Sequence, residues 1–192
     1  MFNNELWQKP AGGAGGAGFY THQIANSCRF DGAGKYLRTN GSAPTLATKY
    51  TFSTWVKRSK LSASMCLIAS ETNNINYDDF IFNSSNQLYQ TSQRSTTYET
   101  YDVSVYRDIS AYYHVVFQWD TTLASATDRM KVYVNGVRLA WDQTTYSGAI
   151  PQDTALKLNE NGASLSVGYS VSNARIFNGY MAQTAGIDGS IV

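Results

Sequence analysis

Apolar and polar residues alternate with a period of two over most of the chain. In residues 50–58, Tyr50, Phe52 and Val56 share one face of an extended segment, and Trp55 lies on the other. This is the period of a β-strand with two different faces. No segment shows the 3.6-residue repeat of a convincing amphipathic helix, so the pattern predicts β-structure throughout.

Short segments of the same kind recur along the chain, at residues 26–30, 36–38, 64–70, 80–82, 87–90, 98–106, 112–120, 130–134, 137–140, 155–158, 165–169 and 176–181. Asn135-Gly136 separates two of them and predicts a tight hairpin, because a type I′ turn needs positive φ at both central residues. Short strands joined by turns predict an all-β fold, an antiparallel β-sandwich or barrel. Strands and helices do not alternate, which argues against a parallel nucleotide-binding sheet.

The beginning of the chain has a different composition. A short peptide with one large aromatic residue precedes a Pro-, Gly- and Ala-rich hinge, so we divide the chain into an extended N-terminal arm with its hinge, residues 1–19, and a β-domain, residues 20–192. Phe2, Leu6 and Trp7 would anchor the arm in another protein, because buried aromatic residues dominate interfaces. The glycines would uncouple the domain from this anchor. The alternatives are a disordered arm and an arm folded back onto its own domain.

Charge and targeting signals exclude several classes of function. The formal net charge is +1 and only 15% of residues are charged, so nothing favours nucleic acid or an anionic membrane as partner. The opening residues lack the basic and apolar regions of a secretory signal, and no apolar run reaches the ~18 residues of a membrane span. We therefore expect synthesis in the cytoplasm, with Cys28 and Cys66 as buried free thiols rather than a disulfide.

Four segments in order resemble the laminin-G-like, concanavalin A-like jelly roll. They are residues 29–37 (RFDGAGKYL), residues 50–58 (YTFSTWVKR), residues 112–136 with YYHVVFQWD and MKVYVNG, and residues 165–181 with LSVG and FNGYM. The resemblance implies this antiparallel jelly roll from about residue 26 to Met181. The family commonly has two acids directly after the last segment, where this chain has Ala182 and Gln183. That departure argues against a function that depends on those carboxylates.

A narrower resemblance concerns the same segments together with DRMKVYVNGV, the closing FNGYMA and IDG, and the leading FNNELWQKP. These are similar to structural proteins of tailed bacteriophages. The resemblance implies a virion structural protein, an appendage, fibre or decoration subunit, that is made in the host cytoplasm. Its partners would be other virion structural proteins, contacted by the arm while the sandwich faces outward. A homo-oligomer, such as a trimer, would suit a fibre.

The alternative function is a module that binds a glycan on a host cell surface. Sugar rings stack on exposed aromatic rings and bond to nearby amides and hydroxyls, and the candidate residues are Tyr98, Tyr101, Trp141 and Tyr146. Trp55 and Trp119 lie inside regular strands, so we expect them to pack in the core.

The sequence does not favour catalysis. Glycosidases need two acids about 5–9 Å apart, and acids two or four positions apart on one strand could supply them. No strand has that pattern, and the neighbours Asp78 and Asp79 point to opposite faces. His114 has no sequence partners of a catalytic triad. Calcium is the metal to consider, since it takes oxygen ligands from loops, and its candidate ligands are Asp31, Asp120 and Asp188.

Overall fold

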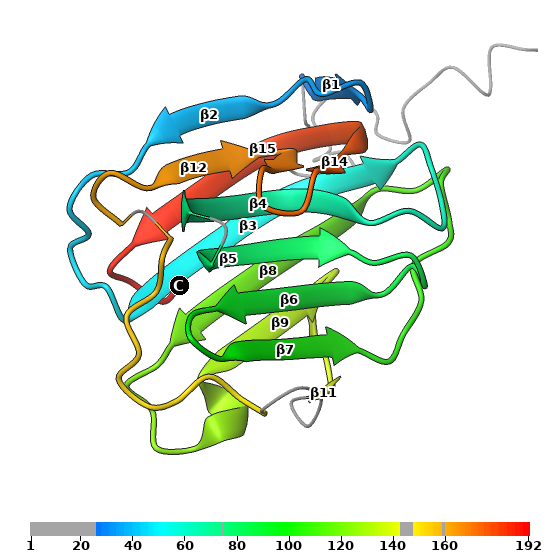
Figure 1. Cartoon of the computed structure of the whole chain (residues 1–192). Coiled ribbons are helices and arrows are strands. Elements are labelled where there is room, and N and C mark those ends of the chain that lie inside the picture. Colours follow the sequence, from blue (N-terminus) through cyan, green and yellow to red (C-terminus); the bar gives the residue numbers. More distant parts are fainter. Residues whose placement is uncertain (1–25, 74, 143–147, 159) are drawn as a thin grey trace, which may run out of the picture.

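Two antiparallel sheets packed face to face form the body of the molecule (Figure 1). The computed structural model describes residues 26–73, 75–142, 148–158 and 160–192. The two packed antiparallel sheets confirm the predicted all-β antiparallel sandwich. The arm with Phe2, Leu6 and Trp7 lies outside the described residues, so its docking stays a prediction.

Sheet A has six strands in the order β1-β15-β3-β8-β9-β10. Their bounds are β1 Cys28–Asp31, β15 Asn178–Asp188, β3 Lys49–Arg58, β8 Tyr113–Asp120, β9 Met130–Val134 and β10 Val137–Arg138. The turn between β9 and β10 has φ of 52° at Asn135 and 80° at Gly136, which confirms the predicted hairpin.

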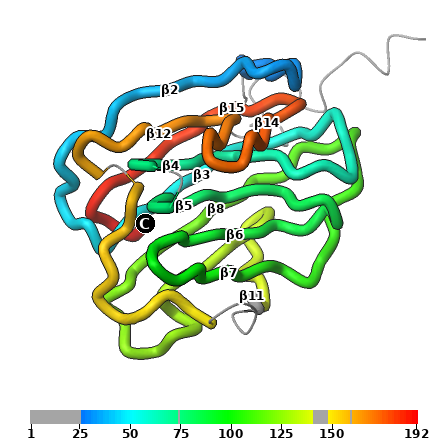
Figure 2. The backbone as a smooth tube through the Cα atoms, viewed as in Figure 1, coloured from blue at the N-terminus to red at the C-terminus, as the bar shows by residue number. Residues whose placement is uncertain are grey.

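Sheet B has seven strands in the order β11-β7-β6-β5-β4-β12-β2. Their bounds are β11 Trp141–Asp142, β7 Thr97–Asp102, β6 Leu88–Gln93, β5 Asn76–Phe82, β4 Met65–Asn73, β12 Ser164–Val167 and β2 Leu37–Asn40. A short hairpin of β13 Tyr169–Ser170 and β14 Arg175–Ile176 lies in front of β4 in Figures 1 and 2. The only helix among the described residues is a 3₁₀ turn, Ala126–Asp128, and none is long and apolar enough to cross a membrane.

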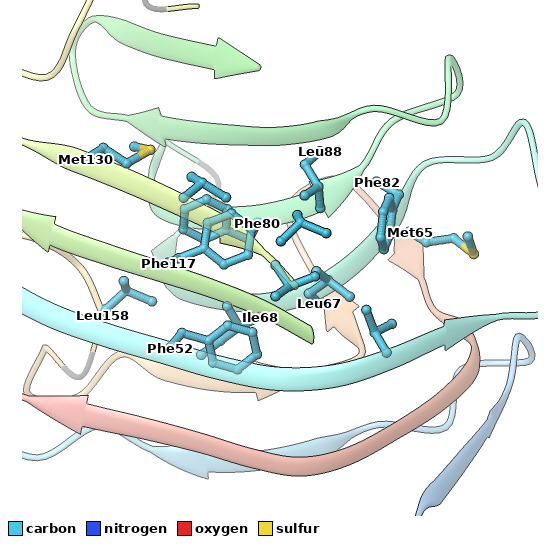
Figure 3. Packing of buried hydrophobic residues seen from close by; sticks show 14 of the residues in the cluster. Phe52, Met65, Leu67, Ile68, Phe80, Phe82, Leu88, Phe117, Met130 and Leu158 are labelled. Atoms are coloured by element: carbon cyan, nitrogen blue, oxygen red, sulfur yellow. The ribbon is translucent and has the colours of Figure 1, made fainter. Parts of the chain in front are cut away.

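Aromatic side chains from both sheets meet in the middle of the sandwich (Figure 3). The ring centroid of Phe80 on β5 lies 3.5 Å from that of Phe117 and 4.2 Å from that of Trp119, both on β8. All three side chains are fully buried. Phe52 and Val56 of β3 are also buried, so the face predicted for these two residues is the inner face of sheet A.

Three local expectations differ from the structure. Trp55 is half-buried on the outer face of sheet A, because it alternates with the inward-facing Thr54 and Val56. Cys28 is an exposed free thiol at the sheet edge, whereas Cys66 is buried as expected. Residues 155–158 form no strand, although Leu156 and Leu158 are buried in the core as part of a closing loop.

We expect Phe80→Ala to lower the free energy of unfolding by about 3–5 kcal/mol, because it removes the ring that joins the two sheets and leaves a cavity. Urea denaturation followed by tryptophan fluorescence measures the change. Val137→Ala, at a side chain that is 66% exposed, is the control and should change stability by less than about 0.5 kcal/mol. Equal losses in the two variants would contradict the central role of this contact.

Candidate functional site

The outer face of sheet B gathers side chains from four neighbouring strands. The pairing register aligns them in three rows across the strands. The rows are Cys66–Ile81–Tyr89–Tyr101, Ala69–Asp79–Thr91–Glu99 and Glu71–Tyr77–Gln93–Thr97. Directly opposed residues of antiparallel strands point to the same face, so each row is a line of neighbouring side chains.

Two tyrosines form an aromatic strip at one side of this face. Tyr89 on β6 and Tyr101 on β7 are opposed in the register, and their rings are nearly parallel, at 12°, with centroids 6.2 Å apart. Both side chains are half-buried. Glu99, two positions before Tyr101 on β7, points to the same side. The strip therefore presents aromatic surface next to a carboxylate.

Of the four residues predicted to bind a glycan, the structure places Tyr98 and Tyr101 on opposite sides of sheet B. Tyr101 belongs to the strip, but Tyr98 lies three positions away on the same strand and so points to the other side of the sheet. It is opposed to Ser92, whose hydroxyl donates to Asp78 between the sheets. The backbone of Trp141 pairs with Asp102 at the edge of the sheet, next to Tyr101. Tyr146 lies outside the described residues.

Sequence reasoning missed Tyr89, because a cross-strand partner is not visible along one strand. The alternation in residues 88–93 does place Tyr89 opposite in orientation to the buried Leu88. That signal indicates an outward tyrosine without indicating its neighbour. Only the register between β6 and β7 brings Tyr89 to Tyr101.

Glu71 fastens the β13–β14 hairpin to this face. Its carboxylate accepts hydrogen bonds from the Ser170 hydroxyl at 2.9 Å, the Ser172 amide at 2.8 Å and the Ser172 hydroxyl at 2.9 Å. Hydrogen bonds to a charged acceptor are stronger than neutral ones. The hairpin is therefore tied to the middle of sheet B and covers part of its outer face.

A buried ion pair forms the second attachment of the hairpin. Arg175 Nη1 lies 2.7 Å from Asp79 Oδ2, and Asp79 is completely buried while the arginine side chain is 20% exposed. Burial raises the pKa of Asp79 to about 6, although the positive charge of Arg175 acts in the opposite direction. The carboxylate is thus charged at neutral pH, and the burial of this charge lowers the free energy of unfolding.

Two acids from different strands point to the same face of sheet B, an arrangement that the expectation for single strands did not cover. Asp79 on β5 and Glu99 on β7 are both opposed to Thr91 on β6, which separates their backbones by about 10 Å. Asp79 is enclosed and engaged by Arg175, so it is not available to transfer a proton to a bound sugar. The pair therefore does not provide two accessible carboxyl groups of the kind a glycosidase uses.

The three calcium candidates do not converge. Asp120 and Asp188 lie at one end of sheet A, where Asp120 pairs with Lys49 and Asp188 accepts from the Thr45 amide. Asp31 lies at the other end of the sheet, opposed to Asn178, and accepts from the Ala33 amide as a turn residue. Among the described residues, no three His, Cys, Asp or Glu side chains are placed to share a metal ion.

A comparison with protein families matches most of the chain to one family. The family model described as the concanavalin A-like lectin/glucanases superfamily matches residues 31–187. No curated protein matches the sequence.

Three of the solved structures that are similar in fold have TM-scores above one half. Domains LG4-5 of the mouse laminin α1 chain share 9% identity at a TM-score of 0.61, covering 87% of this chain and 42% of that one. The CBM40 of the Ruminococcus gnavus IT-sialidase shares 12% identity at 0.56, covering 81% and 93%. Domain 4 of AbnA, an extracellular arabinanase from Geobacillus stearothermophilus in complex with arabinotriose, shares 15% identity at 0.54, covering 87% and 83%. At these low identities the TM-scores show a common fold alone.

We expect the buried Asp79 to make stability fall as pH rises from about 4 to 6. The unfolded residue titrates near 3.8 and the folded one near 6, so the folded chain binds the additional proton in this window. Below pH 4 the raised pKa of Asp79 adds up to about 3 kcal/mol to the free energy of unfolding. This contribution is fully lost above pH 6.

Urea unfolding from pH 4 to pH 7 tests this in the parent chain and in Asp79→Asn, which cannot ionise. The difference in unfolding free energy between the two should change with pH in that window. Asp153→Asn, at an exposed site, is the control and should parallel the parent chain. A parallel curve for Asp79→Asn would refute the assignment.

Proposed function

The chain belongs to the concanavalin A-like lectin/glucanase superfamily, and we propose that it is a non-catalytic module that binds a glycan. The observation that carries this proposal is the parallel Tyr89–Tyr101 strip on the outer face of sheet B. The comparisons support this alternative better than the structural role in a virion. The similar CBM40 and arabinanase domains come from proteins that act on sugars.

The chemistry of the strip suits a sugar ring. One face of a pyranose is lined by C–H groups, which pack on aromatic faces, while its hydroxyls need hydrogen-bond partners. Glu99 lies beside Tyr101 as an acceptor, and Gln93 and Thr97 follow at the end of the same two strands. Ligand sites typically combine aromatic surface with a few precisely placed polar groups.

The covered part of the face limits where a glycan would lie. The β13–β14 hairpin occupies the region over β4 and is held by Glu71 and Asp79. The strip on β6 and β7 is on the side away from this hairpin (Figure 1). We therefore place the glycan along β6 and β7, towards β11.

The virion role is a compatible second proposal. It is favoured by the layout of the chain, in which a peptide with Trp7 precedes a glycine-rich hinge and the β-domain. An appendage of a particle that adsorbs to a cell would use both an anchor and a glycan-binding domain. In this proposal the protein is part of a virion and its partners are other virion proteins and a host surface glycan.

We expect Tyr101→Ala to weaken glycan binding about tenfold, because it removes one half of the aromatic strip. A glycan array with the full chain identifies the ligand, and calorimetric titration of that ligand measures the affinity. Tyr98→Ala is the matched control, since it truncates the same residue type on the same strand but on the opposite side of the sheet. A glycan that binds both variants equally would place its site elsewhere.

For the virion proposal we expect removal of residues 1–10 to abolish incorporation into particles while the β-domain still folds. Complementation of a particle that lacks the protein, followed by protein analysis of purified particles, measures incorporation. A substitution of Trp7→Ala should give a partial loss, because a buried aromatic anchor contributes ~2 kcal/mol or more. Unchanged incorporation of the shortened chain would reject the anchor.

A further inference from the structure

The β13–β14 hairpin lies over a part of sheet B that continues the row of the tyrosine strip. We call residues 169–176, which form this hairpin, the strap. Cys66 on β4 and Ile81 on β5 are opposed in the register and share one row with Tyr89 and Tyr101. Both point to the outer face, yet their exposed fractions are only 0% and 1%. Side chains that point outward from a sheet become this inaccessible only when other groups lie over them.

The buried outward residues form a small apolar cluster apart from the main core. Its members are Cys66, Ala69 and Ile81, and Tyr89 packs against them. The strap contacts β4, the strand that carries Cys66 and Ala69 (Figures 1 and 2). Burial raises the pKa of the Cys66 thiol well above its usual range, and the positive charge of Arg175 in the strap acts on it in the opposite direction. The strap therefore lies over this cluster.

The strap itself buries almost no apolar surface. Only Ser170 of its residues is buried. Its apolar side chains are all half-buried or exposed, and they are Tyr169, Val171, Ala174 and Ile176. The ring of Tyr169 stacks on that of Tyr36, but Tyr36 is itself exposed. Since apolar burial is the main favourable term in folding, the strap receives little of the stabilisation that holds the core.

Polar contacts fasten the strap instead. The carboxylates of Glu71 on β4 and Asp79 on β5 hold it by the hydrogen bonds and the ion pair described above. The side chain of Asn173 adds a hydrogen bond with that of Tyr77 on β5. Water can take the place of each of these partners when the strap lifts, so the net contribution of such bonds is modest.

Both ends of the strap are fixed where it joins the sandwich. The Gly168 amide donates to the Leu67 carbonyl at 3.0 Å, and the Gly168 carbonyl accepts from the Phe177 amide at 2.9 Å. Phe177 is completely buried, and its ring packs edge-on against that of Phe30 with centroids 5.6 Å apart. A motion of the strap can therefore be confined to the residues between these two anchors.

We propose that the strap is a lid that lifts from sheet B while the sandwich stays folded, and that it uncovers Cys66, Ala69 and Ile81. Lifting exposes the row that also contains Tyr89 and Tyr101, so the apolar surface of the strip extends from two strands to four, β4 to β7. Segments with few buried apolar contacts open at a lower free energy than the core. The inference does not depend on the strip being a glycan site.

The test measures how often the Cys66 thiol becomes accessible in the folded chain. Cys28→Ser removes the other, exposed cysteine, so Cys66 is the only thiol left in the full chain. The probe is dithiobis(nitrobenzoic acid), followed by absorbance at about pH 8 in urea concentrations below the unfolding transition. Because a buried thiol is inert, the labelling rate relative to that of the unfolded chain gives the fraction of open molecules.

We expect a labelling rate that hardly changes with urea, because lifting the strap exposes far less surface than unfolding the sandwich. Glu71→Gln and Arg175→Gln should each raise the rate about tenfold, since each removes a charge-assisted contact of the strap. Arg138→Gln is the matched control. It removes an exposed ion pair with Asp128, away from the strap, and should leave the rate unchanged.

Hydrogen exchange tests the same opening in a chain whose strap is unaltered. The Ser172 amide donates to Glu71, so it exchanges only when the strap lifts. In Cys28→Ser, its exchange should give the same fraction of open molecules as the labelling of Cys66. This comparison remains valid if Glu71→Gln or Arg175→Gln fails to fold.

Three results would overturn the proposal. A labelling rate that rises with urea as steeply as global unfolding would mean that Cys66 is reached only in the unfolded chain. Equal rates in Arg175→Gln and Arg138→Gln would remove the role of the strap in covering the thiol. A Ser172 amide protected as strongly as the amides between β4 and β5 would show that the strap opens only together with the sheet.

Discussion

The contact of Phe80 with Phe117 and Trp119 is the constraint on which the rest of the molecule depends. It joins strand β5 of one sheet to strand β8 of the other by ring-to-ring packing in a fully buried position. Once these inner residues are in place, the period of two determines the direction of every other side chain on those strands. The outer faces are what remains for interactions with other molecules.

The two outer faces carry different polar groups. The β13–β14 hairpin lies over β4, and the carboxylates of Glu71 and Asp79 hold it there. Sheet B therefore carries buried carboxylates under the hairpin, and its tyrosine strip lies on the neighbouring strands β6 and β7. On the outer face of sheet A the polar groups include two cations, Arg29 and Lys57, that lie over aromatic rings. The same sandwich thus offers two surfaces of different chemistry.

The attachments of the hairpin are of a different kind from the core. The core is held by apolar packing, which hardly responds to pH, whereas the hairpin is held by hydrogen bonds and an ion pair to carboxylates. Burial raises the pKa of Asp79 to about 6, so the charge that pairs with Arg175 of the hairpin changes with pH near that value. Local opening of a protein usually begins in segments with few apolar contacts.

Much of the fold was predictable because it follows from local chemistry. The alternation in residues 50–58 indicates a strand with two faces, and Asn135-Gly136 indicates a hairpin because both residues accept positive φ. The candidate site was predictable only in part. Tyr101 was identified from its residue type, but Tyr98 points to the other side of the sheet, and Trp55 was expected in the core although it lies outside. A pattern along one strand separates two faces without indicating which face a second sheet will cover.

The sequence alone thus determined the class of fold, the extended segments and their turns, since these depend on neighbours along the chain. Tertiary structure alone decided that Tyr89 meets Tyr101, that Arg175 reaches Asp79, and that Trp55 stands between His114 and Ala182. These partners are far apart in sequence or on different strands. Their meeting is set by strand register, and a shift of one residue would turn each side chain to the opposite face.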